Sequence, residues 1–404
     1  MSCCGSAGPP AGLQLAAVLR LGLKAPSFKL PTHHWKILRA LLACRTLALG
    51  GHRYGCQHCG QSHFVPHSCR NRHCPLCQGQ AAHRWLEQQE RALLPVPYFH
   101  LVFTLPHVLN PLIQQNQRAL YTLLFAAASQ TLLQFGQHRF GVQLGITAVL
   151  HTWSQTLVGH YHLHCIVTGG GLTSDGSRWV STGGQYLFAV RALSAVFRGK
   201  FCAGLQQLQA EQPLEFHGQL APLAQPKAFA QLLHAATRKK WVVYAKRPFA
   251  GPKQVLAYLA RYTHRVALSP RRLLALDESK QIVTFAWKDY ADGAKRKTMA
   301  LEVKEFLRRF CLHLLPKAFV KIRHFGFLSN RQRQTRVAQA RALLQPPPPP
   351  ERAPGDGQPE AAAAASATTP GRVCPHCGSD RLWVMEVVPA IRLLYRALPA
   401  LDSS

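Results

Sequence analysis

The chain has 404 residues, enough for two or three domains with a sizeable buried core. It carries 48 lysines and arginines against 17 aspartates and glutamates, and the resulting formal charge of +31 is spread along the chain. Such a surface attracts polyanions, so we expect nucleic acid as the partner ahead of an anionic membrane. Between residues 92 and 276 only Asp175, Glu211 and Glu215 are acidic, which argues against a nuclease that holds two metal ions with clustered carboxylates.

No segment predicts a membrane span or a secretion signal. The uncharged run 119–137 is interrupted by polar side chains and predicts a buried helix. Residues 11–23 are apolar but short, broken by Arg20 and without a clear cleavage site. Thirteen cysteines, six of them between residues 44 and 77, fit metal binding in a reducing cytoplasm better than a disulfide framework.

The cysteine cluster predicts a structural zinc site. Cys56-x2-Cys59 and Cys74-x2-Cys77 are two pairs separated by fourteen residues. Each pair can direct two sulfurs at one ion about 2.3 Å away, so the spacing is typical of a four-thiolate zinc ribbon. Four protein ligands leave no open position for water, and the flanking arginines favour a DNA-binding role. Further candidate ligands are Cys44, His52, His58, His63, His67, Cys69 and His73, of which Cys69 and His73 lie near enough to the second pair to join a second zinc or replace a ligand.

After the cysteines, helical and extended stretches alternate. The short gap at residues 158–159 implies a hairpin, so the strands on its two sides are expected to be antiparallel neighbours. Gly169–Gly171 is expected to turn the chain after the second of these strands. The expected elements are helix 80–94, strand 98–105, helix 111–137, strands 146–155 and 160–168, helices around 190–210 and 226–240, strand 241–246, strands 281–287 and 298–303, and basic helices up to 345.

The strand after the hairpin carries a candidate metal site. His162 and His164 are two residues apart, so they project from one face and can offer two imidazoles to one divalent ion. The preferred third ligand is Gln155, which lies on the neighbouring strand seven residues before His162. Two other side chains compete for that position, His151 and His160.

A helix is expected to begin near Pro252 and to end before Pro270. At about 100° per residue, two tyrosines and two arginines cluster on one side of it, namely Tyr258, Arg261, Tyr262 and Arg265. An adjoining apolar arc is expected to pack against the sheet, formed by Val255, Leu256, Leu259, Thr263 and Val266. A metal-binding strand facing paired phenols indicates a site that cuts phosphodiesters, with the guanidinium groups binding phosphate.

The C-terminal part contains one more cysteine pair. Residues 346–372 are rich in proline and alanine and predict a disordered linker. Beyond it, Cys374 and Cys377 form a knuckle. Two thiolates cannot close a tetrahedral zinc site, so His376, or a pair borrowed from elsewhere in the chain, is needed to complete it.

Taken together, these stretches resemble the two-tyrosine HUH rolling-circle transposases of bacterial insertion sequences, the insertion-sequence-91-like family. The resemblance runs from about residue 30 to about 335 and rests on the stretches 56–59, 68–77, 95–106, 151–155, 162–171 and 258–265, in the right order. It implies an α+β protein in which a zinc ribbon precedes a ferredoxin-like antiparallel sheet. The expected parts are a flexible extension (1–28), a zinc-binding and DNA-binding domain (29–95), the HUH catalytic domain (96–280), a basic C-terminal part (281–345), the linker (346–372) and a tail with a possible zinc knuckle (373–404).

The resemblance also implies the chemistry. A Mg²⁺ or Mn²⁺ ion on His162, His164 and a third ligand would polarise the scissile phosphate. Tyr258 or Tyr262 would attack it, leaving a 5′-phosphotyrosine and a free 3′-hydroxyl. Two phenols in i, i+4 register suit rolling-circle transfer of single-stranded DNA between element ends, with the 3′-hydroxyl priming host replication.

Two other functions stay open at this point. A plasmid replication initiator or relaxase could share the same core chemistry and differs chiefly by lacking the N-terminal ribbon. A non-catalytic zinc-dependent DNA-binding protein would keep the basic charge and the cysteines but make the histidine and tyrosine pairs coincidental.

Overall fold

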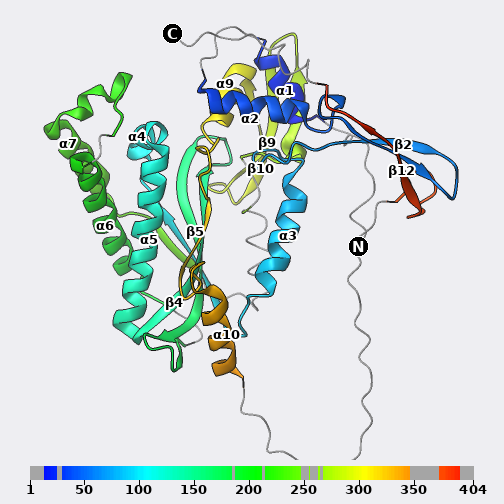
Figure 1. Cartoon of the computed structure of the whole chain (residues 1–404). Coiled ribbons are helices and arrows are strands. Elements are labelled where there is room, and N and C mark those ends of the chain that lie inside the picture. Colours follow the sequence, from blue (N-terminus) through cyan, green and yellow to red (C-terminus); the bar gives the residue numbers. More distant parts are fainter. Residues whose placement is uncertain are drawn as a thin grey trace, which may run out of the picture.

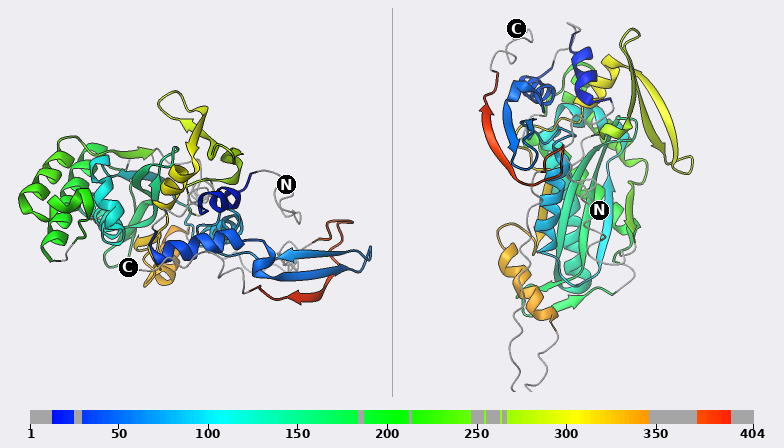
Figure 2. Two further views of the ribbon diagram at one scale, coloured as in Figure 1. Left: turned by 90° about the horizontal axis from the view of Figure 1, so that it is seen from above. Right: turned by 90° about the vertical axis from the view of Figure 1, so that its right-hand side faces the viewer.

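The structure, a computed structural model, places its elements in three antiparallel sheets with helices around them (Figures 1 and 2). Among the described residues no helix has both the length and the apolar character needed to cross a membrane. The structure describes residues 13–24, 30–183, 187–211, 214–246, 254, 263, 267–345 and 373–391.

The central sheet has the strand order β11-β4-β5-β3-β7, and every neighbouring pair is antiparallel. Its β3 and β4 are joined through α4 and α5, and β5 and β7 through α6 and α7, which gives two interleaved β-α-β units, the ferredoxin-like arrangement that was expected. The short β6 pairs with β5. The strands are β3 (Tyr98–Thr104), β4 (Val142–Trp153), β5 (Gly159–Thr173), β6 (Trp179–Ser181), β7 (Val243–Lys246) and β11 (Ile322–Gly326).

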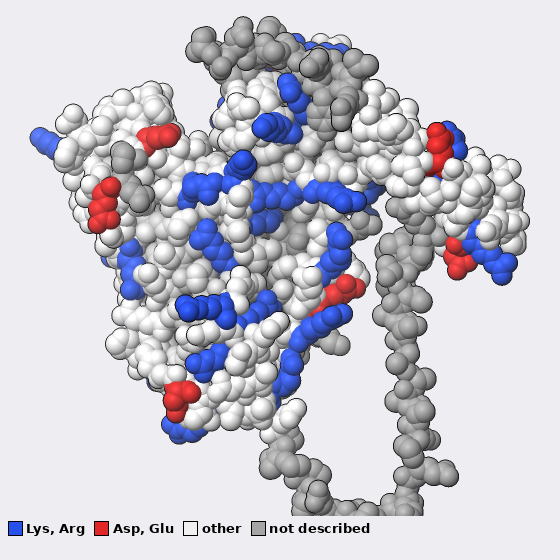
Figure 3. Space-filling view, viewed as in Figure 1, with Lys and Arg blue, Asp and Glu red and all other residues white. Residues whose placement is uncertain are grey.

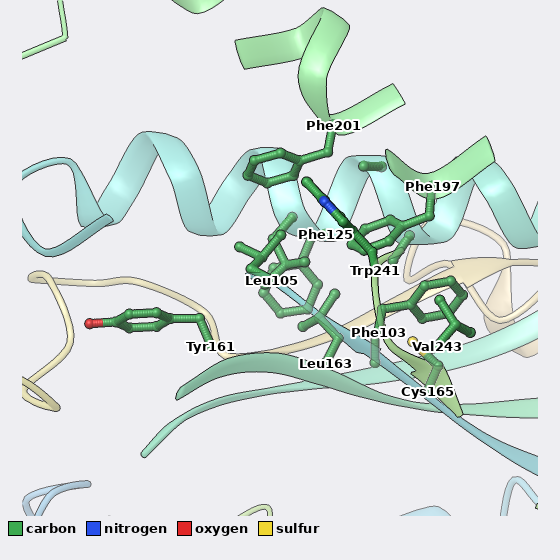
Figure 4. Packing of buried hydrophobic residues seen from close by; sticks show 14 of the residues in the cluster. Phe103, Leu105, Phe125, Tyr161, Leu163, Cys165, Phe197, Phe201, Trp241 and Val243 are labelled. Atoms are coloured by element: carbon green, nitrogen blue, oxygen red, sulfur yellow. The ribbon is translucent and has the colours of Figure 1, made fainter. Parts of the chain in front are cut away.

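Helices cover one face of this sheet and build the largest hydrophobic core (Figure 1). In Figure 4, Phe103 and Leu163 from the strands face Phe125 of α5 and Phe197 of α6. All four of these side chains are at most 1 % exposed. The helices are α4 (Asn110–Gln115), α5 (Gln117–Phe140), α6 (Val190–Glu211) and α7 (Pro226–Thr237).

The opposite face of the sheet meets α3 (Gln78–Glu90) and α10 (Arg333–Leu344). Trp85 of α3 and Val337 of α10 are buried there with Ile166 of β5. Along β5 the residues therefore alternate, because successive side chains of a strand point to opposite faces. Leu163, for example, enters the helical core, while Ile166 enters this second cluster.

A second sheet, β10-β9-β8, packs with α1, α2 and α9. Val18 and Leu19 of α1 are fully buried in this cluster, and a Cβ on Gly22 would lie 2.1 Å from the Leu307 side chain of α9. The expectation that residues 1–28 form a flexible extension is therefore wrong for the described residues 13–24. The elements are α1 (Leu15–Gly22), α2 (Thr32–Ala43), β8 (Leu273–Asp277), β9 (Ile282–Asp289), β10 (Lys295–Glu302) and α9 (Val303–Cys311).

A third sheet projects from the body as an arm (Figures 1 and 2). Its order is β12-β1-β2, so the C-terminal strand β12 (Leu382–Val388) lies beside the N-terminal strand β1 (Gly51–Cys56). The hairpin partner of β1 is β2 (Ser62–Pro66). Short 3₁₀ turns complete the description at Leu47–Leu49, His107–Leu109, Gly218–Ala224 and Pro270–Arg272.

Most of the strands and helices expected from the sequence are present. Gly169–Gly171, however, does not turn the chain, because β5 continues to Thr173. The lack of a side chain at Gly171 instead allows the backbone of β4 to approach closely. A Cβ on Gly171 would lie 2.5 Å from the Gln143 carbonyl oxygen. Strand β11 was not expected, and the predicted linker 346–372 lies outside the described residues.

Candidate active site

Three histidines converge on the face of the central sheet opposite the helical core. His162 and His164 share one face of β5, and the antiparallel register sets His151 of β4 directly opposite His162. A bulge follows immediately, between His151 and Trp153. The ligand atoms of the three histidines all lie within 4.8 Å of one another, and all three side chains are buried.

The spacing of these nitrogens suits a metal ion. Nε2 of His162 lies 3.1 Å from Nε2 of His164. Two ligands at right angles on bonds of about 2.1 Å are about 3.0 Å apart. The histidines therefore present nitrogens at the separation that adjacent coordination positions require.

The outer nitrogens of the pair are held by hydrogen bonds. Nδ1 of His162 donates to the backbone carbonyl of His160 at 3.0 Å, which leaves Nε2 of His162 with a free lone pair. Nδ1 of His164 lies 2.8 Å from Nε2 of His100 on β3. If Nε2 of His164 held a metal, the proton of this ring would be on Nδ1 and His100 would accept it, as second-layer partners of metal ligands do.

Burial keeps these imidazoles neutral. Removal from water lowers the pKa of His162 to about 3 and that of His164 to about 2. Burial likewise lowers the pKa of His100 to about 4. At neutral pH each ring is uncharged and offers a lone pair, as metal binding requires.

The structure does not bring Gln155 to this cluster. The β4–β5 ladder ends at Trp153 and Gly159, so Gln155 lies in the connecting turn and is directed toward the second sheet. Its side-chain oxygen accepts from the backbone N–H of Lys288 at 3.4 Å, and its carbonyl accepts from Arg272. His151, and not the preferred candidate Gln155, lies with His162 and His164.

The remaining histidine candidate, His160, is turned aside. Its Nδ1 lies 3.1 Å from Nε2 of His107, which follows β3. Its backbone carbonyl accepts the hydrogen bond from His162, and its ring lies beside that of His162, with the ring centroids 4.8 Å apart. Sequence reasoning did not single out His100, although it lies within the resembling stretch 95–106 and its burial on a strand beside two histidines was the available signal.

The predicted tyrosines and arginines, Tyr258, Tyr262, Arg261 and Arg265, lie outside the described residues. Gln254 and Thr263, which flank most of that stretch, are both helical. Thr263, expected on the apolar arc of the helix, is 0 % exposed.

The cysteines form two clusters instead of one. Cys44, Cys69, Cys74 and Cys77 gather at the base of the β1–β2 hairpin. Their sulfurs approach to 3.5 Å (Cys44 to Cys77 and to Cys74) and 3.7 Å (Cys69 to Cys77). A tetrahedron of zinc–sulfur bonds of about 2.3 Å separates its sulfurs by about 3.8 Å, so this cluster fits a structural zinc.

Cys56 and Cys59 do not join Cys74 and Cys77, so the predicted single ribbon is wrong in its pairing. The reason is the hairpin: β1 carries the chain away from its base and β2 returns it. Six strand residues span roughly 20 Å. Cys56 and Cys59 therefore lie at the tip, where they meet Cys374 and Cys377.

His73 is not a ligand of the base cluster. Its Nε2 accepts a hydrogen bond from the backbone N–H of Leu315 at 3.1 Å, and its Nδ1 lies 3.1 Å from the Asn71 side-chain oxygen. The neighbouring Arg72 donates to the carbonyls of Pro316 and Phe319. His73 and Arg72 thus connect the zinc-binding domain to the segment that leads into β11.

Comparison with known proteins identifies the two halves of this arrangement. Residues 22–105 match the family model described as "Transposase zinc-binding domain", and residues 145–336 match the model described as "Putative transposase". The chain is 43 % identical to "Putative transposase y4qJ" of Sinorhizobium fredii (strain NBRC 101917 / NGR234), over 80 % of this chain and 81 % of that protein. It is 31 % identical to "Transposase for insertion sequence element IS801" of Pseudomonas savastanoi pv. phaseolicola, over 72 % of this chain and 69 % of that protein.

Solved structures of a conjugative relaxase, TrwC, are more distant. The complex with OriT DNA described as metal-free has 16 % identity and a TM-score of 0.22, covering 41 % of this chain and 71 % of that chain. The metal-bound complex has 16 % identity and a TM-score of 0.23, covering 60 % and 71 %. With matches to both transposase models and to these two relatives, the chain belongs to the insertion-sequence-91-like family of transposases with an N-terminal zinc-binding domain.

Proposed function

We propose that the protein nicks and joins single-stranded DNA through a 5′-phosphotyrosine and so moves an insertion sequence by rolling-circle transposition. The observation that carries the proposal is the convergence of His151, His162 and His164 on one buried point, with no carboxylate among the three. A divalent ion bound there would polarise a phosphate oxygen and offset the charge that develops during attack.

The residues of this chain fit such an ion. Nε2 of His162 and Nε2 of His164 lie 3.1 Å apart and would hold the ion together with His151. The Nδ1 atoms of the two rings would keep their protons, directed to the His160 carbonyl and to His100. Three imidazoles favour a transition ion, so Mn²⁺ is expected to bind more tightly than Mg²⁺.

Tyr258 and Tyr262 are the proposed nucleophiles, with Tyr258 making the first cut. One phenol holds the first 5′ end while the second attacks another phosphodiester, and each attack releases a 3′-hydroxyl that is available to prime host replication. Arg261 and Arg265 are proposed to bind the scissile or adjacent phosphate.

The charge distribution supports a DNA substrate. Figure 3 shows lysines and arginines scattered over the face that includes the central sheet and α10, with few acidic side chains among them. Asp175 is the only acidic residue between residues 92 and 210. A strand of DNA on this face meets little electrostatic repulsion.

Cleavage of a labelled single-stranded oligonucleotide from an element end tests the proposal. His151→Ala and the double variant His162→Ala with His164→Ala are expected to lose cleavage and keep DNA binding, whereas Gln155→Ala retains cleavage. His138→Ala, on the exposed end of α5, is the matched control. Undiminished cleavage by the double variant, or a covalent adduct that mass spectrometry maps to neither Tyr258 nor Tyr262, would refute the mechanism.

A further inference from the structure

The two cysteine pairs at the tip of the arm are copies of one short turn. Residues 56–60 read Cys-Gln-His-Cys-Gly, and residues 374–378 read Cys-Pro-His-Cys-Gly. In each, the glycine N–H donates to the carbonyl of the first cysteine at 2.9 Å. Both glycines have positive φ, 71° for Gly60 and 75° for Gly378, a conformation that side chains rarely adopt.

Each turn is also closed in the same way on its other side. The N–H of Cys56 donates to the carbonyl of Gln61 at 3.0 Å, and the N–H of Cys374 donates to that of Ser379 at 2.7 Å. Two such knuckles, each directing two sulfurs to one point, are the usual components of a four-thiolate zinc site.

The sulfurs of the two knuckles meet at zinc-binding distances. Sγ of Cys56 lies 3.6 Å from Sγ of Cys377, and Sγ of Cys59 lies 3.7 Å from Sγ of Cys374. All four sulfurs lie within 4.8 Å of one another. A disulfide would require about 2.05 Å, whereas a zinc tetrahedron requires about 3.8 Å, so the spacing is that of a shared ion.

Backbone pairing seats the tail beside the first knuckle. β12 pairs with β1 from Cys56 and Leu382 at one end to Gly51 and Val388 at the other. Beyond the ladder, the N–H of Gln57 donates to the carbonyl of Arg381 at 3.0 Å. The two knuckles therefore face each other because the adjoining strands β1 and β12 are hydrogen-bonded to one another.

Hydrophobic burial does little to hold this strand. Four of the six apolar side chains of β12, Trp383, Val384, Met385 and Val387, are between 47 and 61 % exposed. The one ion pair of β12 with β1 among the described residues, Arg53 with Glu386 at 3.2 Å, is also exposed and contributes little. A bound metal would add to the backbone pairing with β1, because a structural zinc contributes its binding energy to folding.

We infer that Cys56, Cys59, Cys374 and Cys377 bind a second structural zinc ion, which fastens the C-terminal tail to the tip of the β1–β2 hairpin. The cysteine pair left incomplete at each end of the sequence is completed by the other. This zinc is separate from the ion at the base of the hairpin and from the histidine site. The inference therefore does not depend on the proposed catalytic mechanism.

Zinc counting on the full-length protein tests the inference. Wild type is expected to hold about two zinc ions per chain. Cys374→Ser with Cys377→Ser removes about one, and Cys56→Ser with Cys59→Ser removes about one. Because both pairs bind the same ion, the quadruple variant also loses only about one. Cys202→Ser, which lies in neither cluster, is the control.

The outcome that overturns the inference is equally definite. Loss of two zinc ions in the quadruple variant would assign the pairs to different ions, and an unchanged zinc content in Cys374→Ser with Cys377→Ser would exclude the tail from any site. If the Cys56 variants fail to fold, the Cys374 variants, which alter only the tail, still decide between these results.

A second measurement detects the fastening directly. A site-specific protease sequence is inserted within residues 346–372, and the cleaved protein is passed over a sizing column. The wild-type tail is expected to stay with the body, and the tail with Cys374→Ser and Cys377→Ser is expected to elute separately. A wild-type tail that separates in the presence of zinc would overturn the inference.

Discussion

Replacing His100 by phenylalanine is expected to weaken metal binding at the histidine site without removing a ligand. His100 is 1 % exposed, and its Nε2 lies 2.8 Å from Nδ1 of His164. Phenylalanine keeps a ring in this buried space but accepts no hydrogen bond. His164 then has no partner in His100 for the Nδ1 proton that it must carry when its Nε2 binds a metal.

The size of the effect follows from this one contact. Loss of a second-layer partner typically costs about 10–100-fold in metal affinity, or about 1.4–2.8 kcal/mol. The upper half of that range is expected, because both rings are buried and water does not readily replace the lost acceptor. His100→Gln restores an acceptor oxygen and is expected to recover part of the affinity.

The assay is a Mn²⁺ titration of oligonucleotide cleavage, with calorimetry as a direct measure of binding. In His100→Phe the half-saturating Mn²⁺ concentration is expected to rise, while the rate at saturating metal stays close to that of wild type. A lower maximal rate with unchanged half-saturation would mean that His100 only supports the fold. Failure of His100→Gln to improve on His100→Phe would refute the hydrogen-bond argument.

Three further outcomes are expected. Tyr258→Phe and Tyr262→Phe should leave the salt dependence of DNA binding unchanged in filter-binding titrations, because a phenol hydroxyl carries no charge, while the double variant forms no covalent adduct; a shift in the salt slope would contradict this. The thermal midpoint should fall as the pH drops below about 6.5. Burial lowers the pKa of both His313 and His324 to about 4, so below about pH 6.5 the unfolded chain binds more protons than the folded one. A midpoint that stays flat from about pH 7 to pH 5 would contradict this. Leu19→Ala should destabilise the protein by about 2–5 kcal/mol in urea unfolding, whereas a change below about 0.5 kcal/mol would restore the view of residues 1–28 as a loose extension.

Local patterns were sufficient for the elements and for part of the site. Alternation along residues 159–168 predicted a strand with His162 and His164 on one face, and the short gap before it predicted the hairpin to β4. Both depend only on neighbours in the chain. The choice between Gln155 and His151 depended on where the ladder ends, and the bulge after His151 is not visible in the pattern.

Long-range pairing was beyond the sequence argument. The spacing of Cys56, Cys59, Cys74 and Cys77 suggested one ribbon, because spacing alone does not show that the β1–β2 hairpin holds the two pairs at opposite ends. The pairing of β12 with β1 joins residues more than three hundred positions apart, and no local sequence pattern predicts it. Strand β11, which extends the central sheet, was missed for the same reason: its five residues carry a mixed pattern that only the edge of β4 completes.

The alternation of β5 has a consequence for how errors in this protein are tolerated. Leu163 and Cys165 belong to the helical core, and His162 and His164 to the opposite face, so one strand sets both. A slip of one residue would exchange the two sets and place imidazoles among phenylalanines. Such a chain would lose its core together with its histidine cluster. A register shift of β5 is therefore expected to unfold the protein. It is not expected to leave a folded enzyme with a displaced histidine cluster.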